Sequence, residues 1–245
     1  MGSRRLGPVT YNRGLAMPLP DDLIASRKRV AARYLTGKGI EIGALDAPTP
    51  LPQGASIRYV DFRTAGELRH QYPELDAQHF VAVDIIDDGE RLDKFEDGSV
   101  GFVVANHMLE HCENPLGALR NHLRKVAPAG WLFYAMPDMR CGFDSVRPLT
   151  TFDHLVADEA DGGKASRRGH FVEWAKLVSK IDDDAEAAEN ARLNMAYGYS
   201  IHYHVWDGNS WLDFLCRARE HLGNAFEIRH FELSGPEMIS VLYRT

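Results

Sequence analysis

The feature that most constrains the fold is the run from residue 100 to 105, Val-Gly-Phe-Val-Val-Ala, which is almost wholly apolar. Apolar residues at nearly every position are typical of a central strand in a parallel sheet that is covered on both faces. Parallel strands need long crossovers, and these are usually helices. The neighbouring sequence shows this alternation, with strands predicted at 39–42, 57–60, 80–85 and 131–136 and helices at about 22–34, 65–71 and 115–126.

This alternation predicts an α/β fold with an open, doubly wound sheet that binds its ligand at the carboxyl ends of the strands. The pattern changes after Pro137, where helical patterns continue without a clear strand. A helix over 210–221 and two strands over 226–233 and 238–243 then close the chain, and the short turn between the strands predicts an antiparallel hairpin. We therefore expect an N-terminal arm and helix (1–35), a sheet domain (36–137 and 207–245) and a helical substrate-binding insertion (138–206).

Charge and cysteine content narrow the class of protein. A formal net charge of −7 over 245 residues argues against nucleic-acid binding, which needs a basic surface, and we expect the basic run Ser26–Arg29 to be a solvated helix face. Three widely spaced cysteines indicate neither a disulfide framework nor a four-cysteine zinc site. No signal peptide or membrane-length apolar run is present, so we expect a cytoplasmic protein. The sequence does not determine the oligomeric state, and a homodimer is one option.

Two predicted strands end on acidic residues about one crossover apart. The first ends in Glu41-Ile42-Gly43, and the second ends on Asp61. This arrangement is typical of a βαβ unit that holds a ribose-bearing cofactor. The G-x-G-x-x-G pattern of dinucleotide sites is absent, which argues against NAD and for a cofactor without phosphate.

Five segments in register resemble the class I S-adenosylmethionine-dependent methyltransferases, close to the small-molecule "type 11" group. They are Glu41-Ile42-Gly43, Tyr59-Val60-Asp61, the run from Phe95 to Val104, Asn106-His107-Met108-Leu109-Glu110-His111, and the run from Leu123 to Leu132. The resemblance implies a Rossmann-like, seven-stranded, mostly parallel sheet with helices on both faces and one reversed strand. The chain departs from the family at its first motif, where Gly43 stands alone and Leu45-Asp46-Ala47-Pro48 replaces a glycine-rich turn.

The resemblance also implies how the cofactor, S-adenosyl-L-methionine, is held. Gly43 lets its methionine end approach the backbone, and Glu41 faces its cationic amino and sulfonium region. Asp61 accepts hydrogen bonds from both ribose hydroxyls.

The same resemblance assigns the adenine and sulfonium ends. Asp88 matches the acid that receives the adenine amino group, and Asp84 is its competitor because it lies closer to the predicted strand end. Asn106 and His107 follow the fourth strand and are expected beside the sulfonium.

Residues 107–111 also spell H-x-x-E-H, a pattern of some zinc peptidases. On a helix, this pattern would place two imidazoles on one face with a glutamate as base. We disfavour this alternative because the segment directly follows a buried parallel strand and no distinct third ligand is identifiable.

Candidates for a general base lie outside these motifs. If residues 199–206 are extended, His202 and His204 share one face and could line the substrate cleft, and His154 and His170 lie in the insertion as well. Imidazole has a suitable pKa for removing a hydroxyl proton. We expect His204 or His202 to act as base, with Asp138 after the fifth strand as the other candidate. A divalent-metal ligand or a purely structural role remains open for these histidines, and no metal site is assigned.

We therefore predict an enzyme that transfers a methyl group from S-adenosylmethionine to a small-molecule acceptor, most simply a hydroxyl of a sugar or secondary metabolite. Proximity and alignment of the reactants should supply most of the rate acceleration, by lowering the activation barrier by roughly 7–11 kcal/mol. An N- or carboxyl-methyltransferase and a non-catalytic cofactor-binding module are the alternatives.

Overall fold

The computed structural model describes residues 20–72, 75 and 80–245. The predicted N-terminal arm, residues 1–19, lies outside the described residues. The first described helix is α1 (Asp21–Tyr34), which covers the range predicted from the sequence. Within the described residues, no helix is long and apolar enough to cross a membrane.

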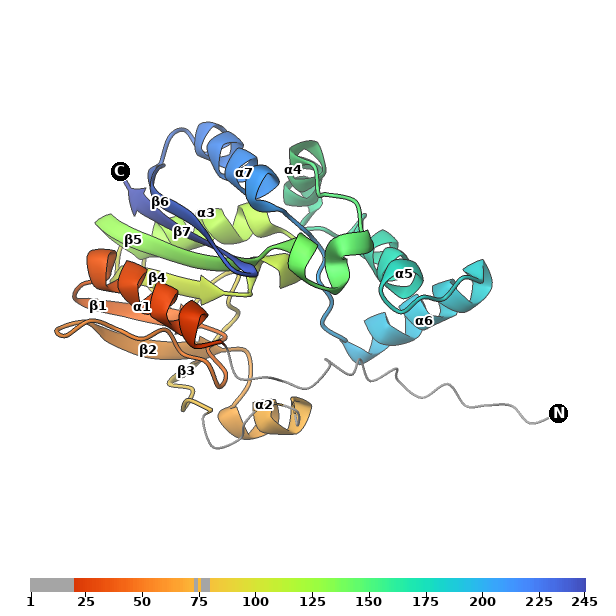
Figure 1. Cartoon of the computed structure of the whole chain (residues 1–245), viewed down its shortest axis with the longest axis horizontal. Coiled ribbons are helices and arrows are strands. Elements are labelled where there is room, and N and C mark those ends of the chain that lie inside the picture. The colour runs from red at the N-terminus through yellow and green to blue at the C-terminus, as the bar shows by residue number, and fades with distance from the viewer. Residues whose placement is uncertain (1–19, 73–74, 76–79) are drawn as a thin grey trace.

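A seven-stranded sheet in the order β3-β2-β1-β4-β5-β7-β6 forms the centre of the molecule (Figure 1). The strands are β1 (Lys38–Ile42), β2 (Ser56–Asp61), β3 (Ile85–Ile86), β4 (Val100–Asn106), β5 (Val126–Pro137), β6 (Phe226–Ser234) and β7 (Glu237–Arg244). The first five are mutually parallel, and β7 runs antiparallel to both of its neighbours. The predicted Rossmann-like sheet with a terminal antiparallel hairpin is confirmed.

Alternate residues of the central strands enter two different cores, because successive side chains of a strand point to opposite faces. On β4, Phe102 and Val104 pack against α1. Val103 and Ala105 face the opposite core, which contains side chains of α3 (Pro115–Lys125) and α7 (Gly208–His221). The apolar run therefore reads as a continuous hydrophobic stretch because both faces of the strand are covered.

The third strand is shorter and later than predicted. The sequence predicts a strand over 80–85, but only Ile85 and Ile86 pair with β2. The Phe80 side chain is buried, and the Val81 amide donates to the Leu45 carbonyl rather than to a strand. The Asp84 carboxylate accepts from the Tyr59 amide at 2.8 Å, so a side chain replaces the strand carbonyl there. The segment before β3 is therefore tied to a loop through its backbone, and the period of its apolar residues does not reveal this.

The fifth strand begins earlier than predicted. Val126 already pairs with Val100, and the next pair joins Trp131 to Phe102, so the residues between them bulge out of the ladder. The turn predicted at 128–130 is this bulge, with Ala129 at φ 63°.

The helical insertion after β5 contains α4 (Phe152–Asp161), α5 (Arg167–Leu177) and α6 (Asp184–Tyr197). Phe171 and Trp174 of α5 form a small separate core with Ile201 and Tyr203 of the extended segment that returns to α7. In Figure 1, α5 and α6 lie beyond the end of the sheet toward which β4 points. The insertion is therefore next to the carboxyl ends of the parallel strands. A short helix, α2 (Ala65–Gln71), follows β2 and carries a complete capping box between Thr64 and Glu67.

Candidate functional site

The order of the strands places a switch point between β1 and β4 at the carboxyl edge of the sheet, where doubly wound sheets form a crevice. The chain leaves β1 toward β2 on one side, whereas β4 lies on the other side of β1. Ligands of doubly wound sheets bind at such a switch point, outside the strand carboxyl ends. The residues at or directly after the ends of β1, β2 and β4 include four predicted site residues, Gly43, Asp61, Asn106 and His107.

Gly43 turns the chain sharply after β1. Its φ is +64°, its amide donates to the Val60 carbonyl at 3.0 Å, and a Cβ added to it would meet no atom within 4 Å. Leu45, where a second glycine is common in such loops, adopts φ +49° with a side chain that makes this conformation costly by about 1–2 kcal/mol. The loop therefore turns tightly without a second glycine and leaves open space beside Gly43.

Glu41 organises this loop from within the protein. Its fully buried carboxylate accepts from the Thr49 amide (3.1 Å), the Thr49 hydroxyl (2.8 Å) and the Asn106 amide group (3.1 Å). Burial raises the pKa of Glu41 to about 7 despite these hydrogen bonds. Thr49 was missed from the sequence because only its place in an irregular loop, after Pro48, brings it to Glu41.

Asn106 presents an acceptor in this network. Its Nδ2 donates to Glu41 and, at 2.7 Å, to the Thr49 hydroxyl, which fixes the orientation of the amide. Its buried Oδ1 has no hydrogen-bond partner among the described residues. A buried carbonyl oxygen of this kind is costly unless a ligand donates to it.

Asp61 lies at the carboxyl end of β2 and is nearly buried. Its Oδ1 accepts from the Phe62 amide at 2.8 Å. Burial raises the pKa of Asp61 to about 6, and the backbone donors of Phe62 and Arg63 oppose this shift only partly. Near neutral pH the group is a carboxylate with remaining acceptor capacity, as a diol requires.

Asp84 and Asp88 lie at opposite ends of β3. Asp84 precedes the strand and is hydrogen-bonded to the edge of β2. Asp88 follows the strand, is exposed, and accepts from the Glu90 amide at 2.9 Å. Of the two, only Asp88 is therefore at the carboxyl edge of the sheet. Asp84 is a candidate because the sequence predicts a strand that ends near residue 85, but β3 begins at Ile85 and Asp84 precedes it.

His107 is fixed by two residues that sequence analysis did not associate with it. It adopts φ +49°, and its Nε2 lies 2.7 Å from Oε1 of Glu237, the first residue of β7. Glu237 also accepts from Nε of Arg27 at 3.0 Å and from its Nη2 at 2.5 Å. Although burial opposes it, the hydrogen bonds from His107 and Arg27 and the charge of the Arg27 guanidinium lower the pKa of Glu237 to about 2. The expected solvated role of the basic run is wrong for Arg27, which is buried in this ion pair.

Two of the three predicted bases are engaged with other side chains, and the third is buried. His204 is fully buried, and His202 lies 2.6 Å from the Asp144 carboxylate. Asp138 is bound bidentately by Arg140, and this guanidinium lowers the pKa of Asp138. The two histidines belong to different clusters, His202 with Glu110 and His111, and His204 with His154, Asp158 and His170. Their role as base stays a prediction.

The H-x-x-E-H segment does not form an α-helix. Residues Leu109–His111 form a single 3-10 turn. His107 faces Glu237, whereas Nδ1 of His111 lies 2.9 Å from the Ile201 carbonyl. The two imidazoles therefore do not form the paired ligands of a zinc peptidase.

A family model described as a methyltransferase domain matches residues 30–210. No curated protein matches the sequence at a significant level. A Rhodobacter sphaeroides structure described as a Zn-dependent alcohol dehydrogenase is similar with 16% identity, covers 95% of this chain and 92% of that chain, and has a TM-score of 0.54. The structure of a protein from Pyrococcus horikoshii OT3 is similar with 13% identity, covers 91% of this chain and 90% of that chain, and has a TM-score of 0.50. At these identities the likeness shows the fold alone.

Proposed function

The chain belongs to the methyltransferase-domain family, and on that premise we propose that it methylates a hydroxyl group of a small molecule, a sugar or a secondary metabolite. The cofactor is S-adenosylmethionine, which supplies an electrophilic methyl group on a sulfonium centre when it is bound. Methylation of an amine or carboxylate, and cofactor binding without catalysis, are the alternatives. The net charge of −7 supports an acceptor other than nucleic acid. The free state of all three cysteines (Cys112, Cys141 and Cys216) supports a cytoplasmic location.

The observation that carries this proposal is the set of groups around the crevice between β1 and β4. Open space beside Gly43 allows a ligand to approach the backbone. Asp61 offers carboxylate oxygens for a ribose diol, and the Asn106 Oδ1 offers a buried acceptor for an amino group. We assign Asp88 to the adenine amino group because it is exposed beyond the end of β3.

For the acceptor side, we assign His107 as the group best supported to take the hydroxyl proton. The ionised Glu237 can only accept a hydrogen bond, so it holds the proton of His107 on Nε2. That tautomer leaves a lone pair on Nδ1, which lies 3.6 Å from Oε1 of the buried Glu110, and the His107 side chain is 37% exposed. A carboxylate that orients an imidazole in this way is a common device for general bases. His202, His204 and Asp138 are kept as the competing bases.

Calorimetry tests the cofactor site first. S-adenosylhomocysteine should bind and NAD should not, and Asp61→Asn should weaken S-adenosylhomocysteine binding by tenfold or more because one charge-assisted acceptor is lost. Asp182→Asn, which changes an exposed acid in the insertion, is the matched control. Absence of S-adenosylhomocysteine binding to the wild-type chain would overturn the proposal.

Turnover tests the base and the acceptor. Formation of S-adenosylhomocysteine is followed with panels of hydroxylated, amine and carboxylate small molecules. His107→Gln should lower turnover by about 10²–10⁴-fold, a larger change than any in cofactor affinity. If His107→Gln retains full turnover and His202→Gln, His204→Gln or Asp138→Asn loses it, the role of general base belongs to the residue whose variant is inactive. Cofactor binding without turnover on all panels would favour the non-catalytic alternative.

A further inference from the structure

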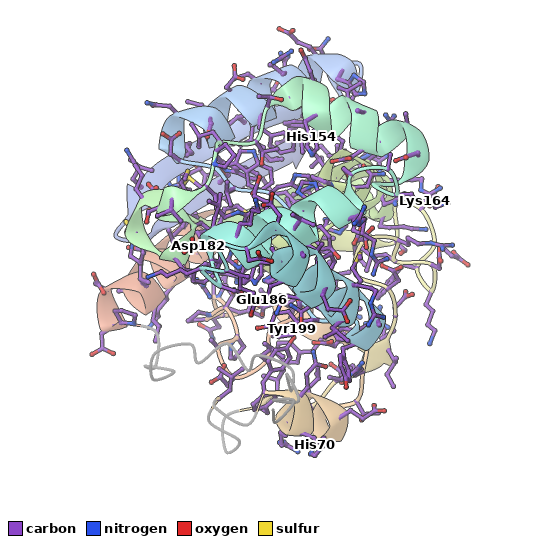
Figure 2. All side chains as sticks on the ribbon, turned by 90° about the vertical axis from the view of Figure 1, so that its right-hand side faces the viewer. His70, His154, Lys164, Asp182, Glu186 and Tyr199 are labelled. Carbon is purple, nitrogen blue, oxygen red and sulfur yellow. The ribbon has the colours of Figure 1, made fainter. Side chains whose placement is uncertain are left out.

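Four side chains outside the crevice bring their ligand atoms together. His154, Asp158, His170 and His204 each offer one atom, and these atoms all lie within 4.8 Å of one another. His154 and Asp158 are one turn apart on α4, His170 is on α5, and His204 is on the extended segment before α7. Figure 2 looks onto this part of the molecule and shows His154 in the space between α4 and α5.

The separations suit direct coordination of one small ion. The His154 Nε2 lies 3.0 Å from the His170 Nε2 and 3.2 Å from the Asp158 Oδ2. The Asp158 Oδ2 lies 3.6 Å from the His204 Nε2 and 4.0 Å from the His170 Nε2. Ligands of a tetrahedral zinc ion, with bonds of about 2.0–2.2 Å, lie about 3.3–3.6 Å from one another. The four observed distances bracket this value.

Two of the four side chains are buried without the hydrogen bonds that burial demands. Within the described part of the chain, neither ring nitrogen of His204 has a hydrogen-bond partner, and neither does the Asp158 Oδ2. The backbone carbonyl of Glu113 is near enough to raise the pKa of His204, but it does not meet the geometry of a hydrogen bond. Buried polar atoms of this kind are rare, because each one costs the protein the desolvation of that group.

The second oxygen of Asp158 is oriented by another residue. Its Oδ1 accepts from the Ser166 hydroxyl at 2.5 Å, which turns Oδ2 toward the three imidazoles. Metal ligands are commonly held by such an outer hydrogen bond. Burial lowers the pKa of His170 to about 4 and the pKa of His204 well below its ordinary range, so both imidazoles are neutral, as metal binding requires.

We propose that His154, Asp158, His170 and His204 bind one divalent transition-metal ion of the zinc class. Three imidazole nitrogens and one carboxylate oxygen suit Zn²⁺, whereas Mg²⁺ and Ca²⁺ prefer oxygen ligands. Four protein ligands fill a tetrahedral ion, so the site is structural rather than catalytic. The ion joins α4, α5 and the 201–207 segment, and it thereby fixes the insertion beside the strand ends. The sequence leaves a metal-ligand role open for these histidines without assigning a metal site, and this proposal assigns one.

The test uses full-length protein purified without a polyhistidine tag. Elemental analysis should find one zinc per chain, and Co²⁺ in its place should give the visible absorption of a tetrahedral nitrogen–oxygen site. A chelator should lower the melting temperature, and added Zn²⁺ should restore it.

Matched variants locate the ion. His154→Gln changes the most exposed of the four side chains, so this variant is expected to fold. The substitution should weaken Zn²⁺ binding more than about 100-fold. That loss exceeds the one caused by changing a residue that only hydrogen-bonds to a metal ligand. Asp158→Asn should weaken binding as well. His230→Gln is the control, because His230 also lies beside a carboxylate, that of Glu232 on β6, but outside the cluster.

Two results would overturn the proposal. One is a wild-type protein that contains no metal and does not bind or respond to added Zn²⁺ or Co²⁺. The other is retained binding in His154→Gln together with loss in His111→Gln, which would assign the ion to Glu110, His111 and His202. Calorimetry with S-adenosylhomocysteine on the same samples reports on the cofactor site separately, since none of the four ligands is assigned to it.

Discussion

Burial raises the pKa of two carboxyl groups, Glu41 and Asp61, at the ends of neighbouring strands. Their hydrogen-bond partners decide which of the two can still accept a hydrogen bond from a ligand. Glu41 is fully buried and accepts from Thr49 and Asn106, so it is committed to holding the loop. Asp61 accepts from a backbone amide through Oδ1 and retains acceptor capacity. At the scale of single residues, Asp61 is therefore the carboxylate free to respond to a cofactor ribose.

Cofactor affinity should depend on pH through Asp61. Burial raises the pKa of this group to about 6, so protonation below that pH removes an acceptor for the ribose hydroxyls. The dissociation constant of S-adenosylhomocysteine should be flat above pH 7 and should rise by up to tenfold per pH unit below about 6.

Calorimetry of wild type and Asp61→Asn between pH 5 and 8 measures this dependence. The variant should bind weakly at every pH and lose most of the slope. An equal slope in both proteins would assign the titration to another group.

At the scale of elements, Arg147 ties the insertion together. Its buried guanidinium donates to Asp144 at 2.8 Å, to Glu173 of α5 at 2.8 Å and to the Tyr203 carbonyl at 3.2 Å. Asp144 in turn contacts His202 at 2.6 Å. One side chain thus connects the turn after β5, helix α5 and the extended segment before α7.

Arg147→Ala should destabilise the insertion by about 3–5 kcal/mol, because it leaves the buried Asp144 without its guanidinium partner. Arg192→Ala removes an exposed pair with Glu189 on α6 and should cost less than about 1 kcal/mol. Urea unfolding gives the free energies, and limited proteolysis locates any local opening between residues 138 and 206. Equal stability of the two variants would contradict this role for Arg147.

At the scale of the whole molecule, His122 connects α3, β5 and the loop after β3. Its Nδ1 lies 2.9 Å from the Tyr134 hydroxyl and its Nε2 lies 2.8 Å from the Gly89 carbonyl. These partners satisfy a neutral imidazole that donates from Nε2 and accepts at Nδ1. Burial lowers the pKa of His122 to about 4.

Because the pKa of His122 is lower in the folded protein than in the unfolded chain, where it is about 6.5, the unfolded state binds more protons between these values. The stabilisation is complete above pH 6.5 and is lost as pH falls toward 4. Relative to pH 7, wild type should lose about 2 kcal/mol at pH 5 through this group.

Urea unfolding of wild type and His122→Gln at both pH values isolates this contribution as the difference between their pH dependences. His70→Gln, an exposed histidine on α2, should behave as wild type. A pH dependence that persists in full in His122→Gln would contradict the assignment.

Much of the fold could be predicted because its signals are local. The apolar run at β4, the acids at the ends of β1 and β2, and the terminal hairpin are each contained in a few consecutive residues. The errors lie where tertiary packing overrides a local pattern. The segment that contains the apolar Phe80 is hydrogen-bonded to a loop through Val81 rather than paired as a strand, and Val126 begins β5 five residues before the predicted start.

The sequence by itself determined the parallel sheet, the position of its binding edge and the class of cofactor, because backbone periodicity and strand-end residues are properties of short segments. Only the tertiary structure decided which side chains meet. Arg27 and Glu237 are 210 residues apart and join at His107, and His154 meets His204 across 50 residues of insertion. The physical reason is that such contacts depend on how separate elements pack, and no spacing within one element encodes that packing.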